Sequence, residues 1–334
     1  MTIRIAINGP GRIGRSIIRA IHEEKYHDLE IVAINSSADI NTLKHLLKYD
    51  SVHGQFNCDV EIKNNKLFVG QKEIILCNDR DPKKLPWKSL NIDLVFECTG
   101  AFTSLSDASL HLGSGAKKVI ISAPAKEPSV KTIVYGVNEN QLTDQDDVIS
   151  IGSCTTNCLA PIAKILNDQL GIEKGFMTTI HAYTNDQNIV DNAHKDLRRA
   201  RACAMSMIPT STGAAKAIGL VLPELKGKLD GVAIRVPTPN VSMIDLNFIA
   251  KRKTSEEEVN NLILNSLSGN LKKVIRYVDE PLVSIDFNHS SFSSCFDATQ
   301  TKVIGDNLVK VCSWYDNEWA FSVRMLDIAR LMVK

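Results

Sequence analysis

The sequence lacks the long apolar runs that membrane proteins need. No hydrophobic run in its 334 residues approaches the roughly 20 residues that cross a bilayer as a helix. Its first residues also lack the charged start, apolar run and small-residue cleavage site of a secretory signal peptide. These absences predict a soluble protein of the cytoplasm with no membrane partner.

Net charge is nearly absent as well, because 39 basic residues oppose 38 acidic ones and leave +1. A chain so balanced has no global field that would attract nucleic acid. Its eight cysteines form no regular framework, and a chain of this length does not need disulfides, so we expect reduced thiols. No internal repeat or low-complexity segment is visible. The length suggests two domains, each large enough to bury a core.

The first part of the chain alternates between strand and helix. Residues 3–8 and 29–34 are typical of buried strands, and residues 12–24 of a helix with isoleucines on one face. This βαβ pattern is typical of a parallel sheet. Further apolar runs continue it, at residues 94–98, 119–122 and 132–135. We therefore predict an α/β Rossmann-type dinucleotide-binding domain over residues 1–152.

After residue 152 the pattern changes. A helix is expected from Cys154 to Leu170, where Gly171 would end it. Longer β-like runs follow, at residues 177–183, 231–235, 241–250, 281–287 and 307–315. Runs of strands separated by turns predict an α+β catalytic domain with a mostly antiparallel sheet over residues 153–316. The C-terminal helix, residues 317–334, is expected to pack back on the first domain.

The segment Gly9-Pro10-Gly11-Arg12-Ile13-Gly14 matches the pattern G-x-G-x-x-G directly after the first strand. Glycines permit a tight turn and a close approach of the backbone to pyrophosphate, which the N–H groups of the following helix would bind. A purely structural turn is the alternative. The spacings of strand, loop, helix and second strand favour dinucleotide binding.

The acid that usually follows such a loop by about 20 residues, and binds the ribose 2′-hydroxyl, is missing. The second strand ends at Ile34-Asn35-Ser36, so Ser36 occupies its position. Asp39 lies beyond the strand, where we expect it to start or cap a helix over residues 39–48.

Cys154 is a candidate nucleophile at the expected start of a helix. The helix dipole and free N–H groups stabilise a thiolate there, and the same N–H groups can hold an oxyanion. A small buried cysteine is one alternative, and metal binding together with Cys158 is another. No second Cys/His pair at ligand spacing is visible, so we expect no metal. Cys158 is expected to be a buried residue that only contributes to packing.

A cysteine nucleophile needs a base, and eight histidines are available. His181 ends an apolar strand, a position that often presents a side chain to a site. A surface histidine, or one satisfied in the core, is the alternative for each of them. The basic run 194–201 lacks interleaved aromatic residues, so we expect it to bind a small phosphate rather than nucleic acid. Residues 210–216 resemble a phosphate-cradling turn before a helix, without Walker spacing.

From residue 3 to its C-terminus the chain resembles the glyceraldehyde-3-phosphate dehydrogenase family. The motifs that carry the resemblance are NGPGRIGR (8–15), SCTTNCLAP (153–161), HAYTNDQ (181–187), RVPTPNVS (235–242) and WYDNEW (314–319). Several long motifs in the correct order make the resemblance specific. It implies the reversible, phosphorylating oxidation of glyceraldehyde 3-phosphate by a homotetramer, in glycolysis or gluconeogenesis.

The resemblance also implies roles for single residues. Cys154 would be the nucleophile, and His181 would activate it and take the hydroxyl proton. The substrate phosphate would lie near Thr184 and Arg235. Inorganic phosphate, which cleaves the resulting thioester, would contact Ser153, Thr155, Thr212 and Gly213, with Arg199 close to both anions. The implied cofactor contacts are Gly9, Gly11, Arg12, Ile13, Gly14, Ser36, Arg80, Ser122, Asn192 and Asn317, the last of them holding the nicotinamide carboxamide.

Some positions depart from the family pattern. Three of these departures are Pro10, Ile151-Gly152 and Ala320-Phe321. We expect them to change the fine positioning of groups at the site but not the activity. Members that prefer NAD carry Asp where Ser36 stands, and this Asp repels a 2′-phosphate. The segment Asp191-Asn192-Ala193-His194 also departs from the pattern of NAD-preferring bacterial members. Both departures favour NADP use, with dual specificity for NAD and NADP.

Two other functions stay open. Erythrose-4-phosphate dehydrogenases share the cysteine and the histidine, but Tyr183-Thr184-Asn185 and the turn at 212–215 keep the triose-phosphate pattern. A non-catalytic nucleotide-binding protein would not require Cys154, His181 and two anion sites. Glyceraldehyde 3-phosphate is therefore the favoured substrate.

Overall fold

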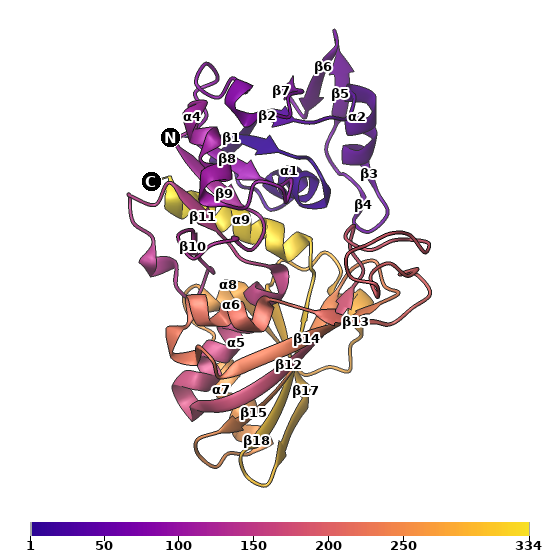
Figure 1. The fold of residues 1–334 in the computed structure, drawn as a ribbon. Helices are drawn as coiled ribbons and strands as arrows, with labels where there is room; N and C mark the ends of the chain where they lie inside the picture. Colours follow the sequence, from indigo (N-terminus) through magenta and orange to yellow (C-terminus); the bar gives the residue numbers. More distant parts are fainter. Residues whose placement is uncertain (1, 334) are drawn as a thin grey trace. The chain divides into compact units, whose positions relative to one another are not determined.

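The structure is a computed structural model that describes residues 2–333. The chain forms two compact units, whose elements are drawn in Figure 1. The first contains the described residues up to Ile133, Glu139–Gly152, and the described residues from Phe321 onward. The second contains Val134–Asn138 and Ser153–Ala320. Within residues 2–333 no helix is both long and apolar enough to cross a membrane.

The first unit is built on a nine-stranded sheet in the order β10-β11-β9-β8-β1-β2-β7-β6-β5. Neighbours from β10 to β7 pair parallel, and β7, β6 and β5 pair antiparallel. The strands are β1 (Ile3–Asn8), β2 (Leu29–Asn35), β5 (Val60–Lys63), β6 (Lys66–Val69), β7 (Lys72–Cys77), β8 (Leu94–Glu97), β9 (Lys118–Ile121), β10 (Lys131–Thr132) and β11 (Val148–Ser150). The other elements are α1 (Arg12–Glu23), α2 (Ile40–Lys48), β3 (Tyr49–Asp50), β4 (Gly54–Gln55), α3 (Leu105–Ala108) and α4 (Leu110–Gly113), with short 3₁₀ turns at Pro82–Lys84 and Glu139–Gln141.

The central strands of this sheet are continuous apolar runs because both faces are covered. Ile5, Ile7 and Leu94 are completely buried. Strand β1 lies between β2 and β8, so the strand order reverses at β1, and in this fold nucleotides bind at the carboxyl ends of the strands beside such a reversal. The predicted Rossmann-type α/β fold is confirmed.

The second unit has a seven-stranded sheet in the order β13-β14-β12-β15-β18-β17-β16. The pairs β12–β14 and β16–β17 are parallel and the other four are antiparallel. The strands are β12 (Ile172–Ala182), β13 (Ile208–Ser211), β14 (Leu229–Val236), β15 (Ser242–Ala250), β16 (Ile275–Val278), β17 (Ser294–Ile304) and β18 (Leu308–Tyr315). Helices α5 (Cys154–Leu170), α6 (Ala214–Val221) and α7 (Glu256–Asn265) pack against this sheet (Figure 1), and α8 (Leu271–Val274) precedes β16. The predicted mostly antiparallel α+β domain is confirmed.

Helix α5 begins and ends where the sequence predicts. The Ser153 side chain accepts a hydrogen bond from the backbone N–H of Thr156, which is the usual N-cap bond. Gly171 follows the last turn at φ +69°, a left-handed conformation that favours glycine. The helix therefore starts at Cys154 for local reasons.

The predicted strand over residues 281–287 is wrong. The segment contains a 3₁₀ helix, Ser284–Phe287, and Asp286 Oδ2 accepts a hydrogen bond from the N–H of Val283. Pro281 has no N–H to offer a neighbouring strand, and the Asp286 bond closes a turn instead. The predicted strand at 132–135 is shortened to β10, because Asn138 Oδ1 takes the N–H of Val134 at 2.7 Å.

The last helix, α9 (Trp319–Met332), contributes most of its length to the first unit. Tyr26 Oη donates to Asp327 Oδ1 at 2.8 Å. Arg330 donates to both carboxylate oxygens of Asp28 and covers the Tyr26 ring at 4.2 Å. These contacts tie the helix to the start of β2.

Candidate active site

Two elements of the second unit bring Cys154 and His181 together. Cys154 is the first residue of α5, and His181 lies one residue before the end of β12. The Sγ atom of Cys154 lies 3.6 Å from Nε2 of His181. The first turn of α5 thus presents a thiol, next to unpaired helical N–H groups, to an imidazole.

The other ring nitrogen of His181 decides the tautomer. Nδ1 lies 2.7 Å from the carbonyl oxygen of Ala182, which can only accept, so the proton sits on Nδ1. Arg235 Nη1 donates to the same carbonyl at 3.0 Å, and its 2.9 Å approach to Nδ1 is a close contact rather than a second hydrogen bond. Nε2 is therefore unprotonated and faces the thiol as a proton acceptor.

Electrostatics keep both partners neutral. Burial, followed by the positive charge of Arg235, lowers the pKa of His181 to about 3. Burial raises the pKa of the Cys154 thiol, while Arg235 and the backbone N–H of Thr155 act in the opposite direction. Cys154 can thus lose its proton by passing it to His181 as it attacks, rather than resting as a free thiolate.

Thr155 takes part in a buried hydroxyl network behind the thiol. Its hydroxyl lies 2.7 Å from the Tyr315 hydroxyl, which also contacts Thr179 Oγ1 at 2.9 Å. All three side chains are buried, and the Tyr315 ring packs edge-on against His181. The Thr155 hydroxyl thus links the start of α5 to Tyr315, and both the side chain and the backbone N–H of Thr155 act to lower the pKa of the Cys154 thiol.

Arg235 stands opposite His181 in the parallel pair of β12 and β14. Its Nε atom is buried and makes no hydrogen bond within the described part of the chain. A buried guanidinium donor without an acceptor is costly unless a ligand supplies one. Arg235 therefore fits a bound oxyanion beside the thiol.

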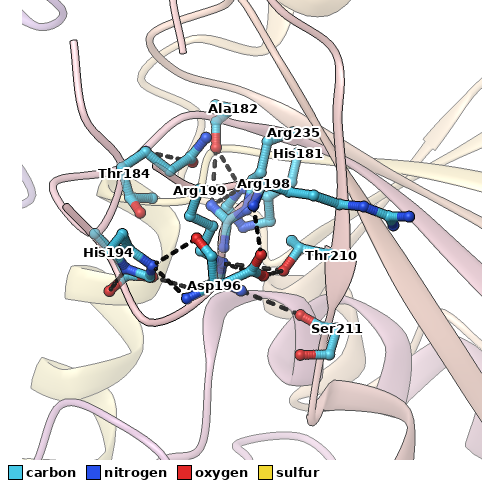
Figure 2. A network of polar contacts seen from close by, with 12 residues as sticks. His181, Ala182, Thr184, His194, Asp196, Arg198, Arg199, Thr210, Ser211 and Arg235 are labelled. Carbon is cyan, nitrogen blue, oxygen red and sulfur yellow. Dashed lines mark hydrogen bonds and ion pairs between the residues drawn. The ribbon is translucent and has the colours of Figure 1, made fainter. Parts of the chain in front are cut away.

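Arg199 lies in the same polar network, which Figure 2 shows. Its Nε donates to Thr210 Oγ1 at 3.0 Å, and its Nη2 donates to the carbonyl of Ser211 at 3.2 Å. Asp186 pairs with the remaining terminal nitrogen, Nη1. Asp196 Oδ2 lies 3.7 Å from Nε as a fourth partner, so an incoming anion would have to compete with the carboxylates of Asp186 and Asp196.

The remaining predicted phosphate contacts lie in two places. Ser153 is the N-cap of α5, and its Oγ lies 2.8 Å from Thr156 Oγ1. Thr212 and Gly213 precede α6, where Thr212 Oγ1 accepts from the N–H of Ala214 at 3.2 Å. Thr184 follows β12 in a turn, with its N–H directed to Gln187 Oε1. Ser153, Thr212 and Gly213 thus lie at helix N-termini, which favour anions.

The glycine loop of the first unit has the geometry that a dinucleotide requires. Gly9 has φ +87°, and a Cβ atom there would lie 2.7 Å from Thr99 Cγ2. A Cβ on Gly14 would lie 2.7 Å from the carbonyl oxygen of Gly9. At Gly11, in contrast, a Cβ would meet no atom of the described residues within 4 Å, and no side chain caps α1. The loop is thus closed on the protein side and open in front of the helix N-terminus, which fits a bound pyrophosphate.

Arg12 and Asp39, both near this loop, are engaged within the protein. Arg12 forms a bidentate ion pair with Asp50. Its backbone N–H, rather than its side chain, is therefore the group available to a phosphate. Both carboxylate oxygens of Asp39 are used at the start of α2, by the N–H groups of Asn41 and Thr42 and by the Thr42 hydroxyl. The prediction that Asp39 caps this helix is confirmed.

The other predicted cofactor contacts lie on loops. Ser36 follows β2, and its Oγ accepts from the N–H of Ala38 at 3.0 Å, which leaves the O–H to donate. Arg80 is exposed, Ser122 directly follows β9, and Ile13 lies half-buried in the first turn of α1. Asn192, in the second unit, is exposed, and its side-chain oxygen accepts from the N–H of Ala193.

Sequence reasoning missed a buried polar network beneath the glycine loop. Glu97 Oε2 accepts from Asn8 Nδ2 at 2.6 Å and from His111 Nε2 at 3.0 Å. Trp87 Nε1 donates to His111 Nδ1 at 3.0 Å, which fixes the histidine as the neutral Nε2–H tautomer. Asn8 in turn accepts from Asn35, the residue before Ser36. The only sequence signal was a polar residue at the end of each of three apolar strands, Asn8, Asn35 and Glu97.

Replacing His111 by leucine tests this network. The change leaves the buried Trp87 N–H without an acceptor and removes one donor from the Glu97 carboxylate. We expect the free energy of unfolding to fall by about 2–4 kcal/mol, measured by urea denaturation. The exposed His27 is the control, and His27→Leu is expected to change it by less than about 0.5 kcal/mol. Equal, small effects of both variants would contradict the role of the network.

The chain combines a Rossmann-type nucleotide-binding unit with a second unit that pairs a thiol and an imidazole beside an arginine with an unused donor. This combination defines a class of enzyme. It is that of the nicotinamide-nucleotide-dependent aldehyde dehydrogenases. Comparison with known proteins supplies the family. Residues 3–105 match the family description "Glyceraldehyde 3-phosphate dehydrogenase, NAD binding domain", and residues 153–317 match its C-terminal domain. The chain belongs to the glyceraldehyde-3-phosphate dehydrogenase family.

Relatives of nearly the same length support this membership. A glyceraldehyde-3-phosphate dehydrogenase of Xanthobacter flavus is 58% identical over 334 residues, which cover 100% of this chain and 99% of the relative. Enzymes of the same name from Cereibacter sphaeroides and Geobacillus stearothermophilus are 56% and 55% identical. They cover 99% and 98% of this chain, and the same shares of their own lengths.

Proposed function

We propose that this chain catalyses the phosphorylating oxidation of glyceraldehyde 3-phosphate to 1,3-bisphosphoglycerate. The observation that carries the proposal is the 3.6 Å approach of Cys154 Sγ to the unprotonated Nε2 of His181, with the unsatisfied Nε of Arg235 beside them. A thiol with its own proton acceptor suits attack on an aldehyde, and the arginine suits an anionic substrate.

The first step joins Cys154 to the substrate. The thiol sulfur attacks the aldehyde carbon and its proton passes to His181 Nε2. His181 returns this proton to the carbonyl oxygen, which becomes the hydroxyl of a thiohemiacetal, and the N–H groups in the first turn of α5 stabilise the negative charge that develops on it. The lowered pKa of His181 means that the imidazole is neutral, with Nε2 unprotonated, before the attack.

The second step converts the thiohemiacetal to a thioester. Bound NAD or NADP supplies the hydride acceptor. His181 takes the proton of the hydroxyl as the hydride leaves, and the C=O bond forms. Inorganic phosphate then attacks the thioester carbon, the C–S bond breaks to release the acyl phosphate, and the Cys154 sulfur regains a proton from His181. The protein contributes a nucleophile, a base and stabilised oxyanions.

Two groups of donors support two anion sites. Arg235, with its unused Nε, is proposed for the substrate phosphate together with Thr184. Ser153, Thr212 and Gly213 are proposed for the attacking phosphate, because they lie at the N-termini of α5 and α6. Arg199 would serve both, if the incoming anion displaces Asp186 from its guanidinium.

Steady-state kinetics test the proposed function directly. The purified full chain is assayed with glyceraldehyde 3-phosphate, inorganic phosphate and either NAD or NADP, with acyl phosphate as the product measured. Erythrose 4-phosphate is the control substrate, and we expect it to react with a lower kcat/KM. Failure to form acyl phosphate with either cofactor would refute the proposal.

We further propose that the enzyme accepts NADP as well as NAD. Ser36 stands where a carboxylate would repel a 2′-phosphate, and its O–H is available as a donor. Asp39 is already used as the N-cap of α2, where both of its oxygens accept hydrogen bonds. The exposed amide of Asn192 adds a polar group in the loop that the family places near a neighbour's cofactor.

Restoring a carboxylate by Ser36→Asp is expected to shift preference towards NAD. The negative charge repels the 2′-phosphate and accepts a hydrogen bond from a 2′-hydroxyl. We expect the ratio of kcat/KM for NAD to that for NADP to rise by about tenfold or more, which corresponds to about 1.4 kcal/mol. Ser37→Asp, one residue along, is the matched control. Strict NAD specificity of the unmodified enzyme would contradict the proposal.

A homotetramer is proposed as the working assembly. The segment 185–207 exposes several large apolar side chains, with Met205 86% and Leu197 82% exposed. Such a cluster on one segment is typical of a surface that a second subunit covers. Sedimentation equilibrium of the full chain tests this, and a monomer at micromolar concentration would refute it.

A further inference from the structure

The side-chain amide of Asn317 is held by the hydroxyl of Ser242, which has no role in the steps described above. Ser242, the first residue of β15, accepts a hydrogen bond from the backbone N–H of Ala182 at 3.0 Å. The Ser242 hydroxyl in turn donates to Asn317 Oδ1 at 3.1 Å. Ser242 is completely enclosed at 1% exposure, and Asn317 is buried as well. One serine therefore joins the end of β12 to Asn317.

The direction of these bonds orients the amide. A backbone N–H can only donate, so Ser242 Oγ accepts from Ala182 and has one proton left to give. If the Asn317 amide were turned over, Nδ2 would face the serine oxygen, and the buried Ser242 proton would lose its acceptor. The present orientation keeps Oδ1 towards Ser242. Asn317 Nδ2 makes no hydrogen bond within the described residues and is left as a donor.

Asp316 holds the backbone next to Asn317 in place. Its Oδ1 accepts from the N–H groups of Glu318 and Trp319 at 2.8 and 2.7 Å. Its Oδ2 accepts from Asn240 Nδ2 at 2.8 Å and from the N–H of His289 at 2.7 Å. A buried carboxylate with four donors is rigid, so the position of Asn317 is set by its backbone and the rotation of its amide by Ser242.

We propose that Ser242 is a positioning residue, which turns the Asn317 N–H groups towards the carbonyl oxygen of the nicotinamide carboxamide. The proposal rests on the proposed function, in which Asn317 contacts that group. Through Ala182 the same hydroxyl is tied to the residue after His181, so the base and the cofactor anchor share one rigid support. Ser242 itself touches neither substrate nor cofactor.

Equilibrium binding separates this role from a general structural one. The dissociation constants of NAD⁺ and of ADP-ribose, which lacks the nicotinamide, are measured by titration calorimetry on the full chain. Ser242→Ala is expected to weaken NAD⁺ binding about tenfold and to leave ADP-ribose binding within about twofold. Ser242→Cys keeps the branching of the side chain but replaces the hydroxyl by a larger thiol that is a weak donor, and it is expected to show the same selective loss.

Ser313→Ala is the matched control. Ser313 is a buried serine on the neighbouring strand β18, and its hydroxyl contacts Ser294 rather than any site residue. It is expected to leave both dissociation constants unchanged. Equal weakening of NAD⁺ and ADP-ribose in Ser242→Ala, or no weakening of either, would overturn the proposal.

A double variant tests whether Ser242 acts through Asn317. In the Asn317→Ala background, Ser242→Ala is expected to cause no further loss of NAD⁺ affinity, because the amide it orients is gone. Additive losses would overturn the proposal. The proposed function is refuted by a different result, namely that the unmodified chain binds neither NAD⁺ nor ADP-ribose, or forms no acyl phosphate.

Discussion

Replacing Cys154 by serine is expected to reduce acyl phosphate formation by at least about 10⁴-fold. A serine hydroxyl ionises far less readily than a thiol. The thioester, which conserves the free energy of the aldehyde oxidation, cannot form. His181 and the N-terminus of α5 remain in place, so binding of NAD⁺ should change by less than about twofold. Single-turnover and steady-state rates with glyceraldehyde 3-phosphate measure the loss.

Cys158 supplies the control for this experiment. It lies one turn further along α5 and is buried, with its Sγ 3.5 Å from Ser294 Oγ. Cys158→Ser is expected to retain at least about half of the activity, since it places a hydroxyl of similar size in contact with another hydroxyl. Unchanged acyl phosphate formation in Cys154→Ser would refute Cys154 as the nucleophile.

Replacing His181 by asparagine is expected to lower kcat by about 10²–10⁴-fold at pH 7. Asparagine offers no proton acceptor comparable to Nε2, so the thiol must ionise on its own and the hydroxyl proton of the thiohemiacetal has no base. Cofactor binding should be retained. A variant with near-normal kcat would contradict the assignment of His181 as the base.

The pH profile provides a second measurement on the same variant. An imidazole is neutral above its pKa, and the pKa of His181 is lowered to about 3, so the base stays available throughout pH 5–9. Burial raises the pKa of the Cys154 thiol, so the thiolate fraction of His181→Asn should rise about tenfold per pH unit over that range. The rate deficit of the variant should therefore shrink as pH increases. A wild-type inflection near 6.5 caused by His181 would contradict this account.

Much of the first unit is predictable because its signals are local. The glycine loop, its helix and its two strands lie within the first 35 residues, and each element is specified by apolar periodicity or by a glycine that the turn requires. The cap at Asp39 follows from its place before α2. The buried network of Glu97 and His111 was not predictable, because the neighbouring sequence does not indicate which distant residues they contact.

The errors in the second unit have the same physical origin. Residues 281–287 have the apolar content of a strand, but a strand needs a neighbour to take its N–H groups, and Asp286 closes a turn first. Strands β16 and β17 were missed because their burial depends on the sheet around them. The contact between the Thr155 and Tyr315 hydroxyls was likewise not predictable, since the two residues lie 160 positions apart.

The sequence alone determined the two fold classes, the start of α5 at Cys154 and the open glycine loop, because these depend on residues within a few positions of one another. Tertiary structure alone decided which groups meet. His181 lies 27 residues from Cys154 and 54 from Arg235, and Ser242 lies 75 residues from Asn317. His181 meets Arg235 through the parallel register of β12 with β14, and Ser242 meets Asn317 because it pairs with Tyr315 in the antiparallel register of β15 with β18. Cys154 reaches His181 through the packing of α5 against β12. Register is set by the packing of whole strands, which no short stretch of sequence contains.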